Sequence, residues 1–192
     1  MLNRKFRSKG HGIHSPFAFE VITNVLNSPY TYYAFTDIPE QYPHLTGQTK
    51  SVVRFNRISF MLVNYFKAKY VLEINPGNGI NTEFITAPSS LIKYNSTDFK
   101  IGNPAHGLYD AIFINLHEEY LITDTNTETL IKSLIKLCHD KSFLVINPIN
   151  SRLSKQFWQT IVKDKSISVT FDLKYTGIAF LRSSYSKQHY YV

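Results

Sequence analysis

Hydrophobic positions recur at helical spacing in the first third of the chain. Apolar side chains at intervals of three and four predict helices over residues 15–27 and 50–67. Ser15 and Pro16 are typical of the first helix's N-terminus, because a side-chain oxygen caps free N–H groups and proline fits the first turn. Residues 29–49, between the helices, are rich in tyrosine and proline, and we predict an aromatic-rich loop there.

From residue 70 onward, short continuous apolar runs alternate with amphipathic stretches. The predicted strands are residues 70–74, 90–94, 109–115, 142–147, 167–173 and 177–182. The predicted helices are residues 80–85, 125–139 and 152–163, the second opening with a capping box of Thr125 and Glu128. This alternation predicts a doubly wound α/β fold with a mostly parallel sheet and an antiparallel hairpin at its C-terminal end. We expect residues 1–68 to form an N-terminal arm and helical region packed on a core of residues 69–192.

Composition narrows the class of protein. The chain has 192 residues, 43% hydrophobic and 18% charged, which suits one globular domain and excludes a mostly disordered chain. No run of about 18 apolar residues occurs, so we expect no transmembrane helix and no membrane partner. The basic N-terminus lacks the apolar stretch of a signal peptide, and the single cysteine, Cys138, excludes an internal disulfide and a CxxC metal site. We therefore expect a cytoplasmic protein.

The net charge of +7 is concentrated in part at one end of the chain. The first nine residues contain Arg4, Lys5, Arg7 and Lys9. The excess of positive charge therefore belongs to a terminal arm as much as to the surface of the folded domain. Lys50, Arg54 and Arg57 fall on one face of a predicted helix, at spacings of four and three, and a solvated stripe is the ordinary interpretation.

The most informative motif is residues 73–79, EINPGNG, which follow a predicted strand and precede a predicted helix. Glycine in such a turn adopts positive φ and lets the backbone approach a ligand closely. An acidic residue at the strand end accepts hydrogen bonds or faces a cation. A strand, glycine loop and helix at the carboxyl edge of a parallel sheet are typical of sites for nucleotide-like ligands. A lone Gly-x-Gly is equally common in ordinary turns.

Three segments of the chain resemble one family. The pattern E-x-N-x-G-x-G is similar to the E/D-x-G-x-G-x-G motif of class I S-adenosylmethionine-dependent methyltransferases, and SVTFDLKYTGIAFLR resembles their C-terminal strand pair. The opening KGHGIHSPFAFEVI resembles a GHGIHSPF-type group of bacterial methyltransferase-like proteins. The resemblance implies a Rossmann-like fold, S-adenosylmethionine as cofactor, and a pocket in which Glu73, Gly77 and Gly79 line the methionine and ribose part.

The chain departs from the family's motifs at several strand ends. Asn75 replaces the first loop glycine, and because asparagine tolerates left-handed backbone, we expect the turn to be kept. Asp98 is the only candidate for the acid that holds the ribose, or it belongs beside the adenine. Asn115, a candidate pocket residue, and Asn147 stand where the family carries acids. Since asparagine offers an oxygen but no charge, we expect no magnesium-dependent site and no bound metal.

Residues 80–108 are too few for the complete family pattern, which places two strands and two helices there. A helical crossover takes about 10–12 residues and each loop about 2–6 more. One strand–helix unit therefore fits and two do not. We infer that one unit is missing or collapsed on the adenine side of the pocket, as in a truncated or degenerate member of the family.

Few side chains are candidates for catalysis. His117 and Glu118 follow the strand that ends at Asn115, and the resemblance makes this position suitable for a general base. His11 and His14 have a spacing that could bind a metal, but no third ligand is near in the sequence and a structural turn is the simpler interpretation. Cys138 falls on the apolar face of a predicted helix, where we expect it to pack in the core.

Three hypotheses for the function remain. The first is an S-adenosylmethionine-dependent methyltransferase of unknown acceptor. The second is a non-catalytic protein of the same fold that serves as a binding or scaffold protein. The third is a basic nucleic-acid-binding protein, whose affinity would fall steeply with salt. The sequence identifies neither the acceptor substrate nor the oligomeric state.

Overall fold

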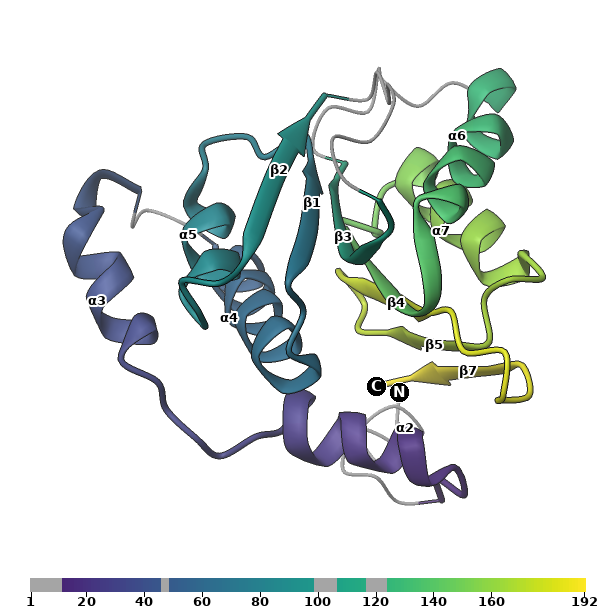
Figure 1. Ribbon diagram of the computed structural model, residues 1–192, viewed down its shortest axis with the longest axis horizontal. Coiled ribbons are helices and arrows are strands. Elements are labelled where there is room, and N and C mark those ends of the chain that lie inside the picture. Colours follow the sequence, from purple (N-terminus) through teal and green to yellow (C-terminus); the bar gives the residue numbers. More distant parts are fainter. Residues whose placement is uncertain (1–11, 46–48, 99–106, 117–123) are drawn as a thin grey trace. The chain divides into compact units, whose positions relative to one another are not determined.

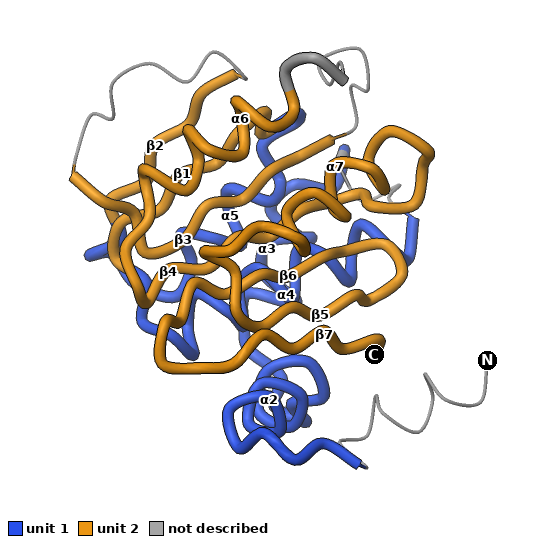
Figure 2. The backbone as a smooth tube through the Cα atoms, turned by 90° about the vertical axis from the view of Figure 1, so that its right-hand side faces the viewer, with its two compact units in different colours: residues 1–68, 77–92, 192 blue, residues 69–76, 93–191 orange. Residues whose placement is uncertain are grey.

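The computed structural model describes residues 12–45, 49–98, 107–116 and 124–192. The chain divides into two compact units, which Figure 2 shows in different colours. The first unit contains residues 1–68, 77–92 and 192, and the second contains residues 69–76 and 93–191. The basic arm that contains Arg4 and Lys9 lies outside the described residues. Among the described residues, no helix combines the length and the apolar composition that crossing a membrane requires.

The second unit is built on a seven-stranded sheet with the order β2-β1-β3-β4-β6-β5-β7 (Figure 1). The strands are β1 (Tyr70–Ile74), β2 (Lys93–Thr97), β3 (Tyr109–Asn115), β4 (Cys138–Asn147), β5 (Val169–Asp172), β6 (Gly177–Phe180) and β7 (Gln188–Tyr191). Strands β2, β1, β3 and β4 run parallel, while β6 is antiparallel to both β4 and β5. The predicted mostly parallel α/β sheet with a C-terminal antiparallel hairpin is confirmed.

One face of this sheet packs against two helices, α6 (Asp124–Lys136) and α7 (Arg152–Lys163). Neighbouring strands present Leu72, Ile112 and Leu144 in register on that face. Each apolar side chain buried in this way stabilises the fold by about 1.5–3 kcal/mol. The packing is closest at Gly177, where a Cβ atom would lie 2.6 Å from the Trp158 ring, so only glycine lets the indole lie against β6.

The first unit is helical. Its elements are α2 (Pro16–Glu20), the π-helix η1 (Val21–Leu26), α3 (Ala34–Gln41), the 3-10 turn η2 (Pro43–Leu45), α4 (Lys50–Phe66) and α5 (Ile80–Thr86). The Ser15 hydroxyl accepts a hydrogen bond from the Ala18 N–H at 3.3 Å, as the predicted N-cap requires. The predicted long helix after residue 49 is confirmed as α4, which buries eight residues.

Two predictions about loops and helix ends are wrong. Residues 29–49 are not all loop, because α3 forms there around the buried Ile38 despite Pro39 within it. The helix predicted over residues 125–139 spans Asp124–Lys136, so Thr125 lies inside the helix rather than at its cap. The chain turns at once into β4, and the Tyr109 N–H donates to the Leu137 carbonyl at 2.8 Å.

Cys138 therefore lies on strand β4 and not on a helix face. Its thiol donates to the Leu134 carbonyl, and burial raises the pKa of Cys138 to about 12 despite a hydrogen bond with Ser142. The thiol is consequently protonated and inert at neutral pH. The expectation that it packs as a structural residue agrees with this environment.

The edge strands differ most from the prediction. The strand predicted over residues 90–94 is β2 at Lys93–Thr97, and β7 has no counterpart in the sequence analysis. Both strands lie at the ends of the sheet, where one side of each pairs with no other strand of the described residues and polar residues are tolerated. Between residues 80 and 98 the described chain holds one helix and one strand, and the rest of the segment 80–108 on which the argument from length bears lies largely outside the described residues.

Candidate functional site

Three parallel strands end side by side at one edge of the sheet in the second unit. Ile74 at the end of β1 is paired with Thr97 of β2 and with Ile114 of β3. In an open parallel sheet, ligands bind beyond this carboxyl edge. The polar residues that the sequence analysis singled out at strand ends are therefore brought together here, and their side-chain partners show what each can do.

Glu73 lies at the centre of this edge and is fully buried. The Tyr94 hydroxyl donates to Glu73 Oε2 at 2.8 Å, and the Asn115 side-chain amide donates to Glu73 Oε1 at 3.1 Å. A buried carboxylate is costly unless it is hydrogen-bonded, and here each oxygen has a donor.

This pairing explains why position 115 carries an amide. A carboxylate at that position would place two acceptors face to face in a buried site, whereas the Asn115 NH₂ group supplies the donor that Glu73 requires. Asn115 is itself buried, at 5% exposure. The departure from the family motif at the end of β3 therefore complements the acid on β1.

Asn75 connects the three strand ends. Its φ of 56° lies in the left-handed region, so the prediction that asparagine keeps the turn is confirmed. Its N–H donates to the Thr97 carbonyl at 2.9 Å, and its side-chain amide donates to the Asn115 carbonyl at 3.2 Å. The start of the glycine loop is thus fixed by hydrogen bonds to both neighbouring strands.

Gly77 and Gly79 continue the loop and belong to the first unit. Their φ values are 63° and 79°, which L side chains rarely adopt. A Cβ atom built at either position meets no described atom within 4 Å. The backbone conformation therefore requires glycine, and the side-chain position of each is open space.

Asp98 immediately follows β2, one residue after Thr97. With the strand boundary corrected to Lys93–Thr97, this acid stands at the carboxyl end of the second strand rather than several residues beyond it. The side chain is exposed. Asp98 is thus exposed, whereas Glu73 and Asn115 are buried and Asn75 is partly buried.

Asn147, at the end of β4, forms hydrogen bonds within the fold. Its side-chain oxygen accepts from the Thr176 hydroxyl at 3.0 Å, and its carbonyl accepts from the Leu116 N–H at 2.7 Å. Across the described ranges, no group of three or more His, Cys, Asp and Glu side chains could hold a metal ion.

Several sequence candidates cannot be placed. His117 and Glu118, the candidates for catalysis, lie outside the described residues, and so does His11. His14 is exposed and directly precedes the Ser15 cap of α2. This position agrees with the interpretation of His14 as part of a structural turn.

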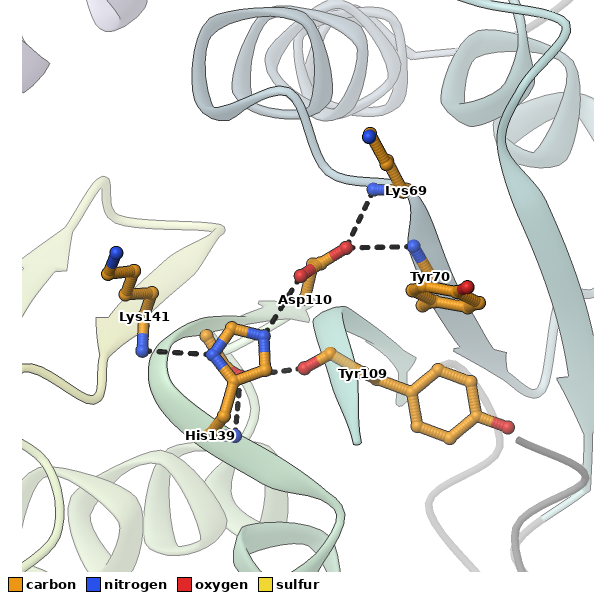
Figure 3. Close-up of polar contacts among 7 residues, drawn as sticks. Lys69, Tyr70, Tyr109, Asp110, His139 and Lys141 are labelled. Carbon is orange, nitrogen blue, oxygen red and sulfur yellow. Dashed lines mark hydrogen bonds and ion pairs between the residues drawn. The ribbon is translucent and has the colours of Figure 1, made fainter. Parts of the chain in front are cut away.

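The sequence analysis missed a second polar cluster, at the opposite edge of the same strands (Figure 3). Asp110 Oδ2 accepts from the backbone N–H groups of Lys69 at 2.7 Å and Tyr70 at 2.9 Å, and Oδ1 contacts His139 Nε2 at 2.9 Å. The Lys141 N–H donates to His139 Nδ1 at 3.1 Å, which assigns the ring hydrogen to Nε2. The only signal in the sequence is a lone acid in the apolar run YDAIFIN.

The electrostatics of Asp110 favour its ionised form. Burial raises the pKa of Asp110, but hydrogen bonds from the backbone of Tyr70 and Lys69 and the contact with His139 outweigh burial and lower the pKa below its usual value. Nearby, the Ser142 hydroxyl donates to the Tyr109 carbonyl at 2.6 Å and accepts from the His139 N–H at 2.8 Å. That hydroxyl is therefore committed to the backbone, and the cluster joins β1, β3 and β4 rather than forming a nucleophilic triad.

Comparison with solved structures shows which proteins share the fold of this chain. A candidate O-methyltransferase from Klebsiella pneumoniae matches with a TM-score of 0.55 at 10% identity, over 83% of this chain and 94% of that one. The O-methyltransferase from Bacillus cereus, solved with SAH, gives a TM-score of 0.53 at 12% identity, over 79% and 92% of the two chains. TomG from Streptomyces achromogenes, an O-methyltransferase solved with SAM, gives 0.53 at 9%, over 80% and 92%.

The chain has the Rossmann-like fold of these methyltransferases. No protein-family model and no curated protein sequence matches it. The likeness is one of fold, since identities of 9–12% carry no residue-level correspondence. The resemblance of residues 9–22 to the GHGIHSPF-type group therefore stays a prediction.

Proposed function

We propose that the chain is an S-adenosylmethionine-dependent methyltransferase of unknown acceptor. The observation that carries the proposal is Glu73. In a methyltransferase fold, this acid is the next-to-last residue of β1, is fully buried, and is held by side-chain donors on the strands to either side. An acid buried near the carboxyl edge of a parallel sheet stands where ligands of such sheets bind, which supports a ligand site at this position.

The residues present suit the cofactor's chemistry. S-adenosylmethionine offers hydroxyl and ammonium donors, and the strand ends offer two acids, buried Glu73 and exposed Asp98. We assign Glu73 to the methionine and ribose part and Asp98 to the ribose hydroxyls. Gly77 and Gly79 belong to the first unit, and their part in cofactor binding stays a prediction from the sequence motif, with which their positive φ values agree.

When bound, the cofactor supplies a methyl group activated by a positively charged sulfur. The part of the protein is to hold and orient it, since positioning alone removes a large share of the barrier to methyl transfer. Asn75 and Asn115 keep the strand ends and Glu73 in place. His117 and Glu118 remain hypotheses for a general base.

A titration calorimetry experiment on the full chain tests the proposal. We expect S-adenosylhomocysteine and S-adenosylmethionine to bind with a stoichiometry of about one and a dissociation constant in the micromolar range, in which typical ligands bind. Absence of heat and of thermal stabilisation at millimolar cofactor would overturn it. A nicotinamide dinucleotide serves as the control ligand, since Rossmann-like sheets also bind such cofactors.

A second candidate function is a non-catalytic binding protein of the same fold. The amides at the ends of β3 and β4 favour it, because they stand at strand ends where acids could serve catalysis. It predicts cofactor binding without methyl transfer to any acceptor in extracts of the source cell. The cytoplasmic location and nucleic-acid binding stay predictions of the sequence.

A further inference from the structure

The first unit contains a pocket that the proposed cofactor site does not use. Its volume is about 450 Å³, and it is lined by residues of η1, the following segment 28–31, α3 and α4. The apolar part of its lining includes Val25, Phe35 and Met61, together with Tyr30, which is 71% exposed. A concave apolar site of this size suits a small molecule.

The basic stripe predicted on the long helix opens onto this pocket. Lys50, Arg54 and Arg57 of α4 all line it, and all three are exposed. No acidic side chain is among the lining residues. In the part of the chain that the structure describes, none of the three cations forms an ion pair with a carboxylate. The positive charge at the pocket is therefore not neutralised within the described fold.

One of these cations is held in place by an aromatic ring. The guanidinium carbon of Arg57 lies 5.2 Å from the centroid of the Phe35 ring, a cation–π contact between α4 and α3. Phe35 also packs edge-on against Phe60, with ring centroids 5.2 Å apart. The positive group is thus ordered beside an apolar wall, which a freely solvated lysine or arginine is not.

We propose that this pocket binds a small amphipathic anion, whose aromatic or aliphatic body fills the apolar part and whose carboxylate, phosphate or sulfonate faces Lys50, Arg54 and Arg57. Guanidinium groups suit such head groups because they donate paired hydrogen bonds. A polynucleotide fits less well, because it needs a track of successive phosphate contacts rather than a single pocket. The proposal does not depend on the cofactor site.

Two fluorescent probes with the same ring system separate the contribution of the anionic group from that of the apolar rings. 1-Anilinonaphthalene-8-sulfonate carries an anionic group, and N-phenyl-1-naphthylamine has the same rings without it. The test variant is Arg54→Gln with Arg57→Gln, which keeps much of each side-chain stem, and the matched control is Lys155→Gln with Lys163→Gln on α7. Both changes remove two exposed positive charges.

We expect the sulfonate probe to bind at one saturable site, about tenfold more weakly in the arginine variant than in the lysine control, as the loss of two exposed ion pairs implies. Binding of the uncharged probe should be equal in both. Val53→Trp, which fills the pocket, should weaken both probes. Equal sulfonate affinity in the two double variants would overturn the proposal. So would a dodecathymidine oligonucleotide that binds tighter than the probe and depends on the same arginines.

Discussion

The two edges of the parallel strands carry two carboxylates with different partners, the half-buried Asp110 and the fully buried Glu73. At the amino edge, Asp110 accepts hydrogen bonds from the backbone N–H groups of β1 and from a histidine on β4. At the carboxyl edge, Glu73 accepts hydrogen bonds from the side chains of Tyr94 and Asn115. Backbone donors belong to any sequence with this fold, whereas a matched tyrosine and asparagine must be specified residue by residue. The difference suggests that Asp110 serves the fold and Glu73 serves a ligand.

Matched carboxylate-to-amide substitutions separate these roles, and the largest effect is expected at Glu73. Glu73→Gln keeps the size of the side chain and an acceptor for Asn115, so the free energy of unfolding should change little. Cofactor affinity should fall about tenfold to a hundredfold, because a charge-assisted hydrogen bond is worth about 1.5–3 kcal/mol. Calorimetry with S-adenosylhomocysteine measures this, with Glu128→Gln on the exposed face of α6 as the control. Unchanged affinity would place Glu73 with Asp110 as a structural acid.

The converse is expected for Asp110→Asn. The new NH₂ group must face either the backbone donors of Lys69 and Tyr70 or the His139 ring hydrogen, so at least one contact of this half-buried side chain becomes donor against donor. We expect the free energy of unfolding to fall by about 1–3 kcal/mol, measured by urea titration, with cofactor affinity unchanged. A variant as stable as the wild type but deficient in cofactor binding would reverse the assignment of the two edges.

The pH dependence of stability should report Asp110 in the same way. Its pKa is lower in the folded chain than the usual value of about 3.9, so the ionised form contributes stability above that value, and this contribution is lost as the pH falls through the folded pKa. The stability difference between wild type and Asp110→Asn should therefore be constant near neutral pH and shrink below about pH 4.

Subtracting the variant removes the contribution of other acids. The hydrogen bonds from Ser183 lower the pKa of Asp140, which would otherwise give the same trend. Asp140 is present in both proteins, so it cancels in the difference. Urea titrations at successive pH values measure the gap, and a gap that persists unchanged to pH 2 would show that its origin is not the ionisation of Asp110.

The smallest effect is expected for Tyr94→Phe. The substitution removes one of the two described side-chain donors to Glu73 and leaves Asn115 in place. One hydrogen bond contributes about 0.5–1.5 kcal/mol, so cofactor affinity should fall about twofold to tenfold. The decrease should be absent when Glu73 is already glutamine, which a double-mutant cycle measures. Additive losses would mean that Tyr94 acts on the cofactor independently of Glu73.

Central elements were predictable from the sequence, because their signals are local. Strand β1 is an apolar run closed by Asn75 and Pro76, and α7 begins after the capping serine Ser151; both were placed at their observed bounds. The edge strands β2 and β7 were not predictable from local signals, since they carry polar residues and depend on pairing with a neighbouring strand. Helix α3 was missed because Pro39 indicates a break, while packing of Ile38 overrides it.

The candidate site was predictable only as a set of positions. Parallel topology places Glu73, Asn75 and Asn115 at one edge, and the glycine motif draws attention to it. The hydrogen bond from Asn115 to Glu73 joins residues 42 apart and depends on the register of two strands, which no local pattern gives. Asp110 was missed for the same reason, because its partners are backbone groups at the start of another strand.

The indole that lies against Gly177 gives the second unit its own optical signal. Trp158 is the single tryptophan of the chain, is 3% exposed, and has the His189 ring 6.3 Å from its own. Tryptophan fluorescence, excited at the red edge of the protein absorption band, therefore reports on the environment of β6 and α7 alone. A dye in the pocket of the first unit emits at longer wavelength. The two units can thus be followed in one sample. Comparing the tryptophan emission with the dye emission during unfolding shows whether the two units lose structure together.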